Sequence, residues 1–304
     1  MYNLTKSIKI ENLDENSIVL DIETNGVSRI HSQVYVIGLI YQNIFYQFAV
    51  ENDKEEEKLL NKVFSFLDSK HIITFNGKNF DIPFLKARYE FYGMKPFEEN
   101  SQFDIYRYLI SNRLITDYKQ FSLQDIEKFN QLERHENFEI DDDVKFYKEI
   151  ENIDISKVLI HNQYDVINTA KLLNLIEKIE ENKKFTINLS SEMKTVKISN
   201  LIIEKDFLQI NIKTSYNSID YAFENENYTI NWNKHGIKIK IKVIEGYVSD
   251  NIKAYVYINP YNKIKDESRY NLQDEFIVIF DTKYYLNNIK NIIKNIMEFE
   301  FYKN

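Results

Sequence analysis

Three short apolar runs near the start of the chain predict neighbouring strands. They cover residues 17–22, 34–41 and 44–50 and are rich in β-branched and aromatic residues, which is the composition of strands. Only Gln42 and Asn43 separate the second run from the third, and this short gap predicts a tight hairpin. We therefore expect three adjacent antiparallel strands.

Helical spacing follows these strands. Residues 53–69 begin with the acidic run DKEEE and continue with apolar residues one turn apart, and negative charge at this end favours a helix through its macrodipole. A fourth strand at residues 71–75 and a helix that ends near Gly93 come next. Further helices are predicted at residues 104–114, 122–130 (with Ser122 as the N-cap), 142–150 and 156–180. The element order resembles that of the ribonuclease H-like fold, an α/β fold with a mixed sheet flanked by helices.

Strict alternation of apolar and polar positions replaces helical spacing after residue 183. Segments such as FLQINIKTS, GIKIKIKVIEGYV and IKAYVYI alternate in this way, and an apolar helical pattern ends the chain. This predicts a smaller, mainly antiparallel β domain closed by one C-terminal helix. We place the boundary near Lys183, with a ribonuclease H-like domain at residues 1–183 and a β-rich domain of unknown role at residues 184–304.

Composition narrows the possible chemistry. The 304 residues contain no Cys, which excludes disulfides, thiolate zinc sites and cysteine nucleophiles, so any metal must bind oxygen or imidazole. The net charge of −8 is uneven, because residues 185–304 hold 16 basic and 15 acidic residues against 23 and 32 before them. Phosphate contacts need local positive charge, so the acidic first part argues against indiscriminate binding of polyanions. The acidic first part is compatible with a site that binds cations of its own, which would supply the missing positive charge.

Membrane and export signals are absent from the sequence pattern. No apolar run approaches the ~20 residues that span a bilayer, and the first residues form no continuous signal-peptide core. We therefore expect a soluble cytoplasmic protein with no membrane partner.

Two carboxylates end the first predicted strand. Asp21 and Glu23 are two residues apart, and side chains with this spacing share one face of a strand. Their carboxylates can converge on one point and then need a counter-charge. The alternative is a strand end that turns into a loop at Thr24, where acidic residues are common.

A polar segment follows the fourth strand. Asn76, Asn79 and Asp81 come directly after it, where open α/β sheets place their ligands. Pro83 suits the first turn of a helix, so Asp81 lies where a helix cap or a metal ligand would lie. A role as a cap alone would leave Asn76 and Phe80 unexplained.

The long predicted helix carries the motif HNQYD. His161 and Asp165 are four residues apart and so share one helical face. A histidine among apolar neighbours is often a partly buried structural residue, and for His161 alone this alternative stays open. Together with the acids of the strand and of the loop, Asp165 completes a carboxylate set that can hold two divalent cations.

The motifs, in this order, resemble those of a known group of nucleases. DIET (21–24), NGKNFDIPFL (76–85) and HNQYD (161–165) resemble the three motifs of the DEDD superfamily of 3′-5′ exonucleases, and the second is similar to the proofreading domains of family B DNA polymerases. FSLQDIEKFNQLERHE (121–136) is similar to the L-x-x-IE-x-x-x-G-x-x-R stretch of the YprB-type ribonuclease H-like family. The resemblance covers roughly residues 15–180.

This resemblance implies roles for individual residues. The metal ligands would be Asp21, Glu23, Asp81 and Asp165, with His161 as the general base. In members of the superfamily, the base position holds either a Tyr separated from the last Asp by three residues or a His separated from it by four. His161 is separated from Asp165 by only three residues, so the identity of the base is in question. The Gly of the YprB-type stretch is also replaced, and we expect Asn130 to take the left-handed cap position instead.

We therefore predict a metal-dependent nuclease, a 3′-5′ exonuclease that hydrolyses single-stranded DNA or RNA. Two Mg²⁺ or Mn²⁺ ions are expected, since carboxylate oxygens select these cations. The expected substrate-binding residues are Asn76, Asn79 and Phe80 at the terminal nucleotide, Lys78 and Arg88 at its phosphates, and Thr24. The alternative is a catalytically silent nucleic-acid-binding or assembly module, although such a module has no reason to retain four mutually repelling carboxylates.

The C-terminal domain is a candidate for binding nucleic acid or a protein partner. Lys238, Lys240 and Lys242 line one face of a predicted strand. A solvated outer face is the favoured interpretation, and a nucleic-acid platform that includes Trp232 and Tyr247 is the alternative.

Overall fold

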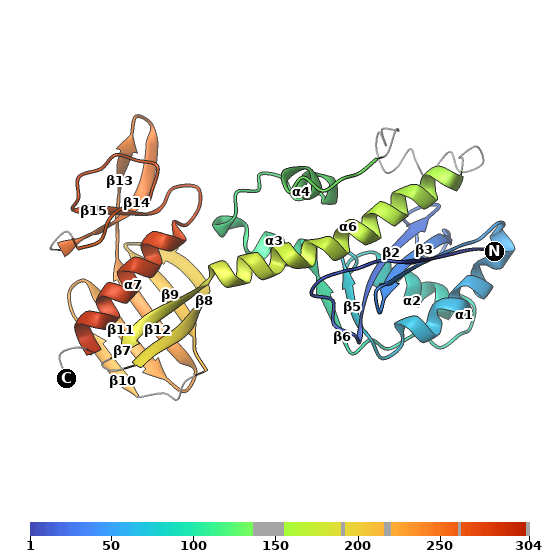
Figure 1. The fold of residues 1–304 in the computed structure, drawn as a ribbon, viewed down its shortest axis with the longest axis horizontal. Coiled ribbons are helices and arrows are strands. Elements are labelled where there is room, and N and C mark those ends of the chain that lie inside the picture. Colours follow the sequence, from blue (N-terminus) through green and yellow to red (C-terminus); the bar gives the residue numbers. More distant parts are fainter. Residues whose placement is uncertain (136–154, 190–191, 216–219, 261–262, 302–304) are drawn as a thin grey trace. The chain divides into compact units, whose positions relative to one another are not determined.

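The computed structural model describes residues 1–135, 155–189, 192–215, 220–260 and 263–301 (Figure 1). Contacts within the chain divide it into two compact units, which are described separately. Unit 1 consists of Met1–Asn112 and Tyr118–Ile176, and unit 2 of Arg113–Asp117 and Glu177–Asn304. The helix predicted at residues 142–150 lies outside the described residues, and the domain boundary near Lys183 stays a prediction.

Unit 1 is built on a six-stranded mixed sheet with the order β1-β4-β3-β2-β5-β6. The strands are β1 (Tyr2–Ser7), β2 (Ser17–Thr24), β3 (Val34–Tyr41), β4 (Ile44–Ala49), β5 (His71–Thr74) and β6 (Ser101–Asp104). The three predicted antiparallel strands are confirmed as β2, β3 and β4. Gln42 and Asn43 both have positive φ, as a two-residue hairpin turn requires. The sequence pattern does not predict the edge strand β1, because its residues are mostly exposed and show no apolar alternation.

Helices cover both faces of this sheet. The described helices of unit 1 are α1 (Glu56–Leu67), α2 (Asp81–Phe91), α3 (Ile105–Ser111), α4 (Leu123–Phe129) and α6 (Ile155–Asn182). Figure 1 shows α1 and α2 on one side of β2 and β3, and α6 on the other. The main core forms where Leu20 of β2 packs with apolar residues of α1 and α2, whereas Val36 of β3 packs against Val158 of α6. Ser122 caps α4 as predicted, since its side chain accepts a hydrogen bond from the Asp125 amide.

Unit 2 is mainly antiparallel β structure with a C-terminal helix, as predicted. Its strands are β7 (Lys184–Leu189), β8 (Glu192–Glu204), β9 (Phe207–Lys213), β10 (Tyr221–Glu224), β11 (Tyr228–Asn233), β12 (Gly236–Lys242), β13 (Ile244–Ser249), β14 (Ile252–Ile258) and β15 (Phe276–Phe280), followed by α7 (Leu286–Phe301). The described strands form a six-stranded sheet, β10-β11-β12-β9-β8-β7, and a separate three-stranded sheet, β13-β14-β15, a division that the alternation pattern does not predict. Ile289 and Ile293 of α7 are fully buried in the core of this unit.

The alternation along β12 is confirmed. Its isoleucines are buried while Lys238, Lys240 and Lys242 are exposed. Trp232 is only 2% exposed and packs against Phe301, so the suggested platform that includes Trp232 is wrong. Among the described helices, none combines the length and the apolar character needed to cross a bilayer.

A glycine sets how closely α6 approaches the sheet of unit 1. The strand register places Asp21 of β2 opposite Gly38 of β3, and Gly38 opposite Gln47 of β4. Asn162 of α6 lies over this row, donating to Asp21 Oδ2 at 2.8 Å and accepting from Gln47 Nε2 at 2.9 Å. A Cβ on Gly38 would lie 2.2 Å from Asn162 Oδ1 and 2.8 Å from Val166 Cγ2. Only glycine therefore allows this contact.

We expect the substitution Gly38→Ala to lower the free energy of unfolding by about 1–3 kcal/mol, the usual effect of overpacking a buried contact. The buried Asn162 and Val166 cannot move aside without displacing α6. Urea denaturation of the full chain measures the effect. Gly246→Ala is the matched control, because a Cβ there would meet nothing within 4 Å. Equal stabilities of the two variants would contradict the close approach of α6.

Candidate functional site

The end of β2 supplies two of the predicted acids. Glu23 is buried, and Asp21 is partly buried beneath α6. Asn162 donates to both the carboxylate and the backbone carbonyl of Asp21, at 2.8 and 3.2 Å. The two acids therefore share the face of the sheet that α6 covers, as their spacing predicts.

Asp81 is anchored to the same strand. It is the first residue of α2, where Phe80 takes the N-cap position without a side-chain cap, and it is buried. Its Oδ1 accepts a hydrogen bond of 3.0 Å from the backbone amide of Ile22, the residue between Asp21 and Glu23. Asp81 is thus held beside the two β2 carboxylates, a placement that the simple helix-cap alternative does not explain.

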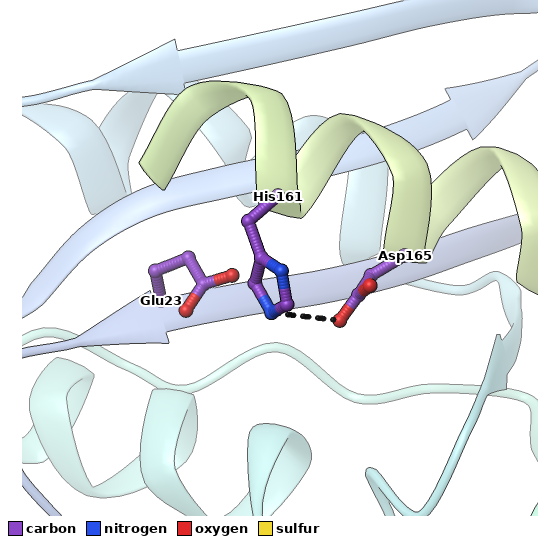
Figure 2. Close-up of side chains that lie close together, drawn as sticks. All are labelled: Glu23, His161 and Asp165. Carbon is purple, nitrogen blue, oxygen red and sulfur yellow. Dashed lines mark ion pairs between the residues drawn. The ribbon is translucent and has the colours of Figure 1, made fainter. Parts of the chain in front are cut away.

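His161 and Asp165 project from one face of α6 toward Glu23 (Figure 2). The distance from His161 Nε2 to Asp165 Oδ2 is 3.4 Å. One ligand atom from each of Glu23, His161 and Asp165 lies within 4.8 Å of the other two. Carboxylate oxygens and an imidazole nitrogen are suitable donors for a divalent cation, so the residues fit a metal site.

Burial and the charges of neighbouring acids raise the pKa values of two of these carboxyls. Burial raises the pKa of Asp21 well above its usual range, and the charges of Asp165, Asp81 and Glu23 raise it further. Burial likewise raises the pKa of Asp81 to about 7, against the stabilising hydrogen bond from Ile22. Both effects are expected for carboxylates that converge without a counter-cation. The electrostatics therefore favour the binding of a positive ion.

The loop between β5 and α2 carries the predicted substrate contacts. Asn76, Lys78 and Asn79 are exposed, and Phe80 is half-buried against Phe84 with ring centroids 5.4 Å apart. Asp104 at the end of β6 fixes this loop by accepting from the amides of Asn76 and Lys78 at 2.9 and 3.2 Å. Asn76 has a φ of +64°, which asparagine tolerates better than most residues.

Thr24 is buried, and its hydroxyl donates to the carbonyl of Gly26 at 2.8 Å. This hydrogen bond holds the turn that follows Glu23. The prediction that Thr24 also binds substrate is not tested by this contact and stays a prediction.

Arg88 does not have the phosphate-binding role predicted for it. It is 1% exposed, and its guanidinium binds Glu56 of α1 through Nε at 2.8 Å and Nη2 at 2.6 Å. A third nitrogen donates to the carbonyl of Ile30 at 3.2 Å. The prediction fails because the neighbouring sequence gives no sign of Glu56, which reaches Arg88 from another helix.

Several residues near the site were not singled out by sequence reasoning. They are Gln47, Asp104, Glu127, Arg134 and Asn162. Asn162 directly follows His161 in HNQYD, and Glu127 and Arg134 lie in the YprB-like stretch. These three residues therefore carried a sequence signal that could have identified them. Gln47 and Asp104 had none, because each acts through a partner distant in the chain.

The expected left-handed cap after α4 falls one residue later than predicted. Asn130 has an ordinary φ of −92°, while Gln131 has a φ of +56°. Gln131 is therefore the residue that stands where the YprB-type stretch has its Gly. The Asn130 side chain instead donates to the carbonyl of Ile126 at 2.7 Å.

A mixed sheet with helices on both faces, and acids at the ends of its strands, defines an α/β protein of the ribonuclease H-like type. A family model described as the RNase_H superfamily matches residues 18–177. The chain therefore belongs to the RNase H superfamily. Membership of the DEDD or YprB-type groups within it stays a prediction.

Similar solved structures are remote. The family B DNA polymerase from the hyperthermophilic archaeon Pyrobaculum calidifontis is 15% identical, with a TM-score of 0.41 over 54% of this chain and 24% of that one. Brucella melitensis NrnC bound to pGG is 17% identical, with a TM-score of 0.36 over 56% and 73% of the two chains. The zinc-bound E. coli ExoI–ssDNA complex is 12% identical, with a TM-score of 0.36 over 64% and 54%. Among curated proteins, no sequence matches the chain. These likenesses are too distant to carry a function to this chain.

We expect Asp81→Asn to stabilise the metal-free protein increasingly as the pH rises. The pKa of Asp81 is about 7 in the folded chain, against an ordinary value of 3.8. The protonated side chain therefore stabilises the wild-type fold fully at low pH, and this stabilisation is lost as the pH rises toward the folded pKa. Asparagine has no proton to lose. Between about pH 5 and about pH 8 the variant should gain about 2 kcal/mol relative to wild type.

Urea denaturation in a chelator at several pH values tests this expectation. Added Mn²⁺ serves as the internal control, because it should stabilise the wild type and reverse the order of the two proteins. A stability difference independent of pH would mean that Asp81 is ionised freely in the folded chain.

Proposed function

We propose that this protein is a metal-dependent nuclease, and that it acts as a 3′-5′ exonuclease on single-stranded nucleic acid. The observation that carries the proposal is the convergence of Glu23, His161 and Asp165 within 4.8 Å of one another. Asp21 interacts electrostatically with Asp165 and Glu23 of this cluster, and Asp81 interacts with Asp165. These five residues come from three separate motifs, and four of them are carboxylates that repel one another when ionised.

The donor set supports a role for divalent cations, with Mg²⁺ or Mn²⁺ as the proposed cofactor. The carboxylates of Asp21, Glu23, Asp81 and Asp165 would hold the ions. A bound cation would lower the pKa of a water molecule and neutralise the charge that develops on the phosphate. We propose that two such ions bind.

The remaining residues would position the substrate and move the proton. In the hydrolysis, a water oxygen forms a bond to phosphorus while the bond from phosphorus to the leaving 3′ oxygen breaks. His161 would accept or orient the proton of this water through its imidazole, and the leaving oxygen would gain a proton from solvent. The exposed Asn76, Lys78 and Asn79 of the β5–α2 loop would contact the terminal nucleotide, with Phe80 at its base.

We expect Asp21→Asn and Asp165→Asn each to abolish the release of mononucleotides from 3′ ends, because each removes a ligand charge. Purified full chain is incubated with Mn²⁺ and 5′-end-labelled single-stranded RNA or DNA, and the products are resolved by length. A ladder that shortens one nucleotide at a time from the 3′ end is the expected result. Asp250→Asn, which removes an exposed acid in unit 2, is the matched control and should keep full activity.

Three outcomes would decide against this function. Cleavage by the Asp21→Asn variant at the wild-type rate would contradict the metal-ligand assignment. Internal cuts would replace the exonuclease by an endonuclease. Tight binding of Mn²⁺ and nucleic acid without any cleavage would instead identify a silent binding module.

We expect His161→Ala to lower kcat by at least about tenfold, the lower range for a positioned base, while His161→Tyr keeps substantial activity. Tyrosine occupies the corresponding place, with three residues before the last Asp, in the nucleases that the motif resembles. The pH–rate profile of the Tyr variant should lose its acid limb, because tyrosine does not titrate near neutral pH. An unchanged rate and pH profile for His161→Ala would make His161 a structural residue.

A further inference from the structure

The stretch of residues 121–135, which the proposed function leaves without a role, places an arginine against the acid cluster. Arg134 follows α4 and is 12% exposed at its side chain, and Glu127 of α4 is 3% exposed. The guanidinium binds this carboxylate with two parallel hydrogen bonds, from Nε to Oε2 and from Nη2 to Oε1, both at 2.7 Å. A fork of this kind fixes the plane and direction of the guanidinium.

The same guanidinium reaches the residues of the proposed site. Its Nη2 also donates to Asp165 Oδ1, and its Nη1 lies 3.4 Å from His161 Nδ1. The other oxygen of Asp165, Oδ2, faces His161 Nε2. One arginine thus contacts both site residues of α6.

Glu127 is itself held in place by α6. Asn168, which is fully buried, donates to Glu127 Oε1 at 3.1 Å and to the carbonyl of Glu133 at 3.3 Å. Lys171 in turn donates to Asn168 Oδ1 at 3.2 Å. The segment that carries Arg134 is therefore pinned to the helix that carries His161 and Asp165.

We propose that Arg134, oriented by Glu127, is a positioning residue that fixes Asp165 and His161 and supplies a permanent positive charge to the carboxylate cluster. This inference rests on the proposed function for its catalytic part. An arginine stays charged at all physiological pH values, so it reduces the mutual repulsion of the acids before any metal binds. The same charge repels an entering cation. Arg134 therefore lowers the affinity of the site for metal while it fixes the geometry of Asp165 and His161.

The two partners should consequently have opposite effects on metal binding. Arg134→Gln removes the repelling charge, and we expect Mn²⁺ to bind at least about threefold more tightly. Glu127→Gln leaves Arg134 without its counter-charge, and we expect Mn²⁺ to bind at least about threefold more weakly. A merely structural pair would loosen the site in both variants and change the affinity in the same direction.

Isothermal titration of the 304-residue chain with Mn²⁺ alone measures these affinities. Because removing one member of a buried ion pair is strongly destabilising, two further variants protect the test against a failure to fold. Arg134→Lys keeps the charge and should retain the wild-type affinity within about twofold. The double variant Glu127→Gln/Arg134→Gln removes both charges and should also lie near wild type.

Turnover provides the second readout. At saturating Mn²⁺, we expect Arg134→Gln to lower kcat at least about tenfold with little change in KM, because Asp165 and His161 lose their orientation. Arg134→Lys should restore part of this loss. Arg269→Gln is the matched control, because it removes another arginine–carboxylate pair, with Asp281 in unit 2, and should change neither quantity.

An Mn²⁺ affinity that is unchanged or weaker in Arg134→Gln, or that moves in the same direction in Glu127→Gln, would overturn the charge role. An unchanged kcat would overturn the positioning role. If the wild type cuts no nucleic acid at all, the proposed nuclease function falls, and with it the catalytic part of this inference. Opposite shifts in Mn²⁺ affinity would still support the charge role, so the two failures are distinguishable.

Discussion

The close packing of α6 on Gly38 is the contact on which the site depends. Asp21 and Glu23 belong to β2, whereas His161 and Asp165 belong to α6, and only a helix close to the sheet brings the two pairs together. A side chain at Gly38 would occupy the space of Asn162 and Val166. Its absence lets Asn162 bridge Asp21 and Gln47, so that one asparagine both docks the helix and orients a carboxylate.

Carboxylates that lie close together repel one another, and in this fold fixed polar groups bind three of them. The amide of Ile22 binds Asp81, the side chain of Asn162 binds Asp21, and the guanidinium of Arg134 binds Asp165. Hydrogen bonds to an ionised carboxylate stabilise its charged form. They do not suffice here, since burial still raises the pKa of Asp21 and Asp81. The ionised forms of these two buried carboxyls are therefore disfavoured without a counter-charge, which is the physical reason to expect a cation.

A second buried ion pair shapes the surroundings of the site without taking part in it. Glu56 accepts from Arg88, from the hydroxyl of Tyr92 at 2.9 Å and from the amide of Val34 at 2.9 Å. Arg88 also binds the carbonyl of Ile30 in the loop that follows Glu23. The pair thereby joins α1, α2 and the start of β3, and it holds one end of the loop beside the acids. Removing either partner would leave a buried charge unpaired, which is strongly destabilising.

The sequence by itself determined the local elements and the order of the motifs. Hydrophobic spacing is a local property, so β2, β3, β4, α1 and the alternation of β12 follow from it, and the spacing within Asp21–Glu23 and His161–Asp165 fixes which side chains share a face. The tertiary structure alone decided which charges meet. It paired Arg88 with Glu56 and Arg134 with Asp165, buried Trp232, and split the β-rich region into two sheets. These outcomes depend on contacts between residues far apart in the chain, for which a single sequence carries no periodic signal.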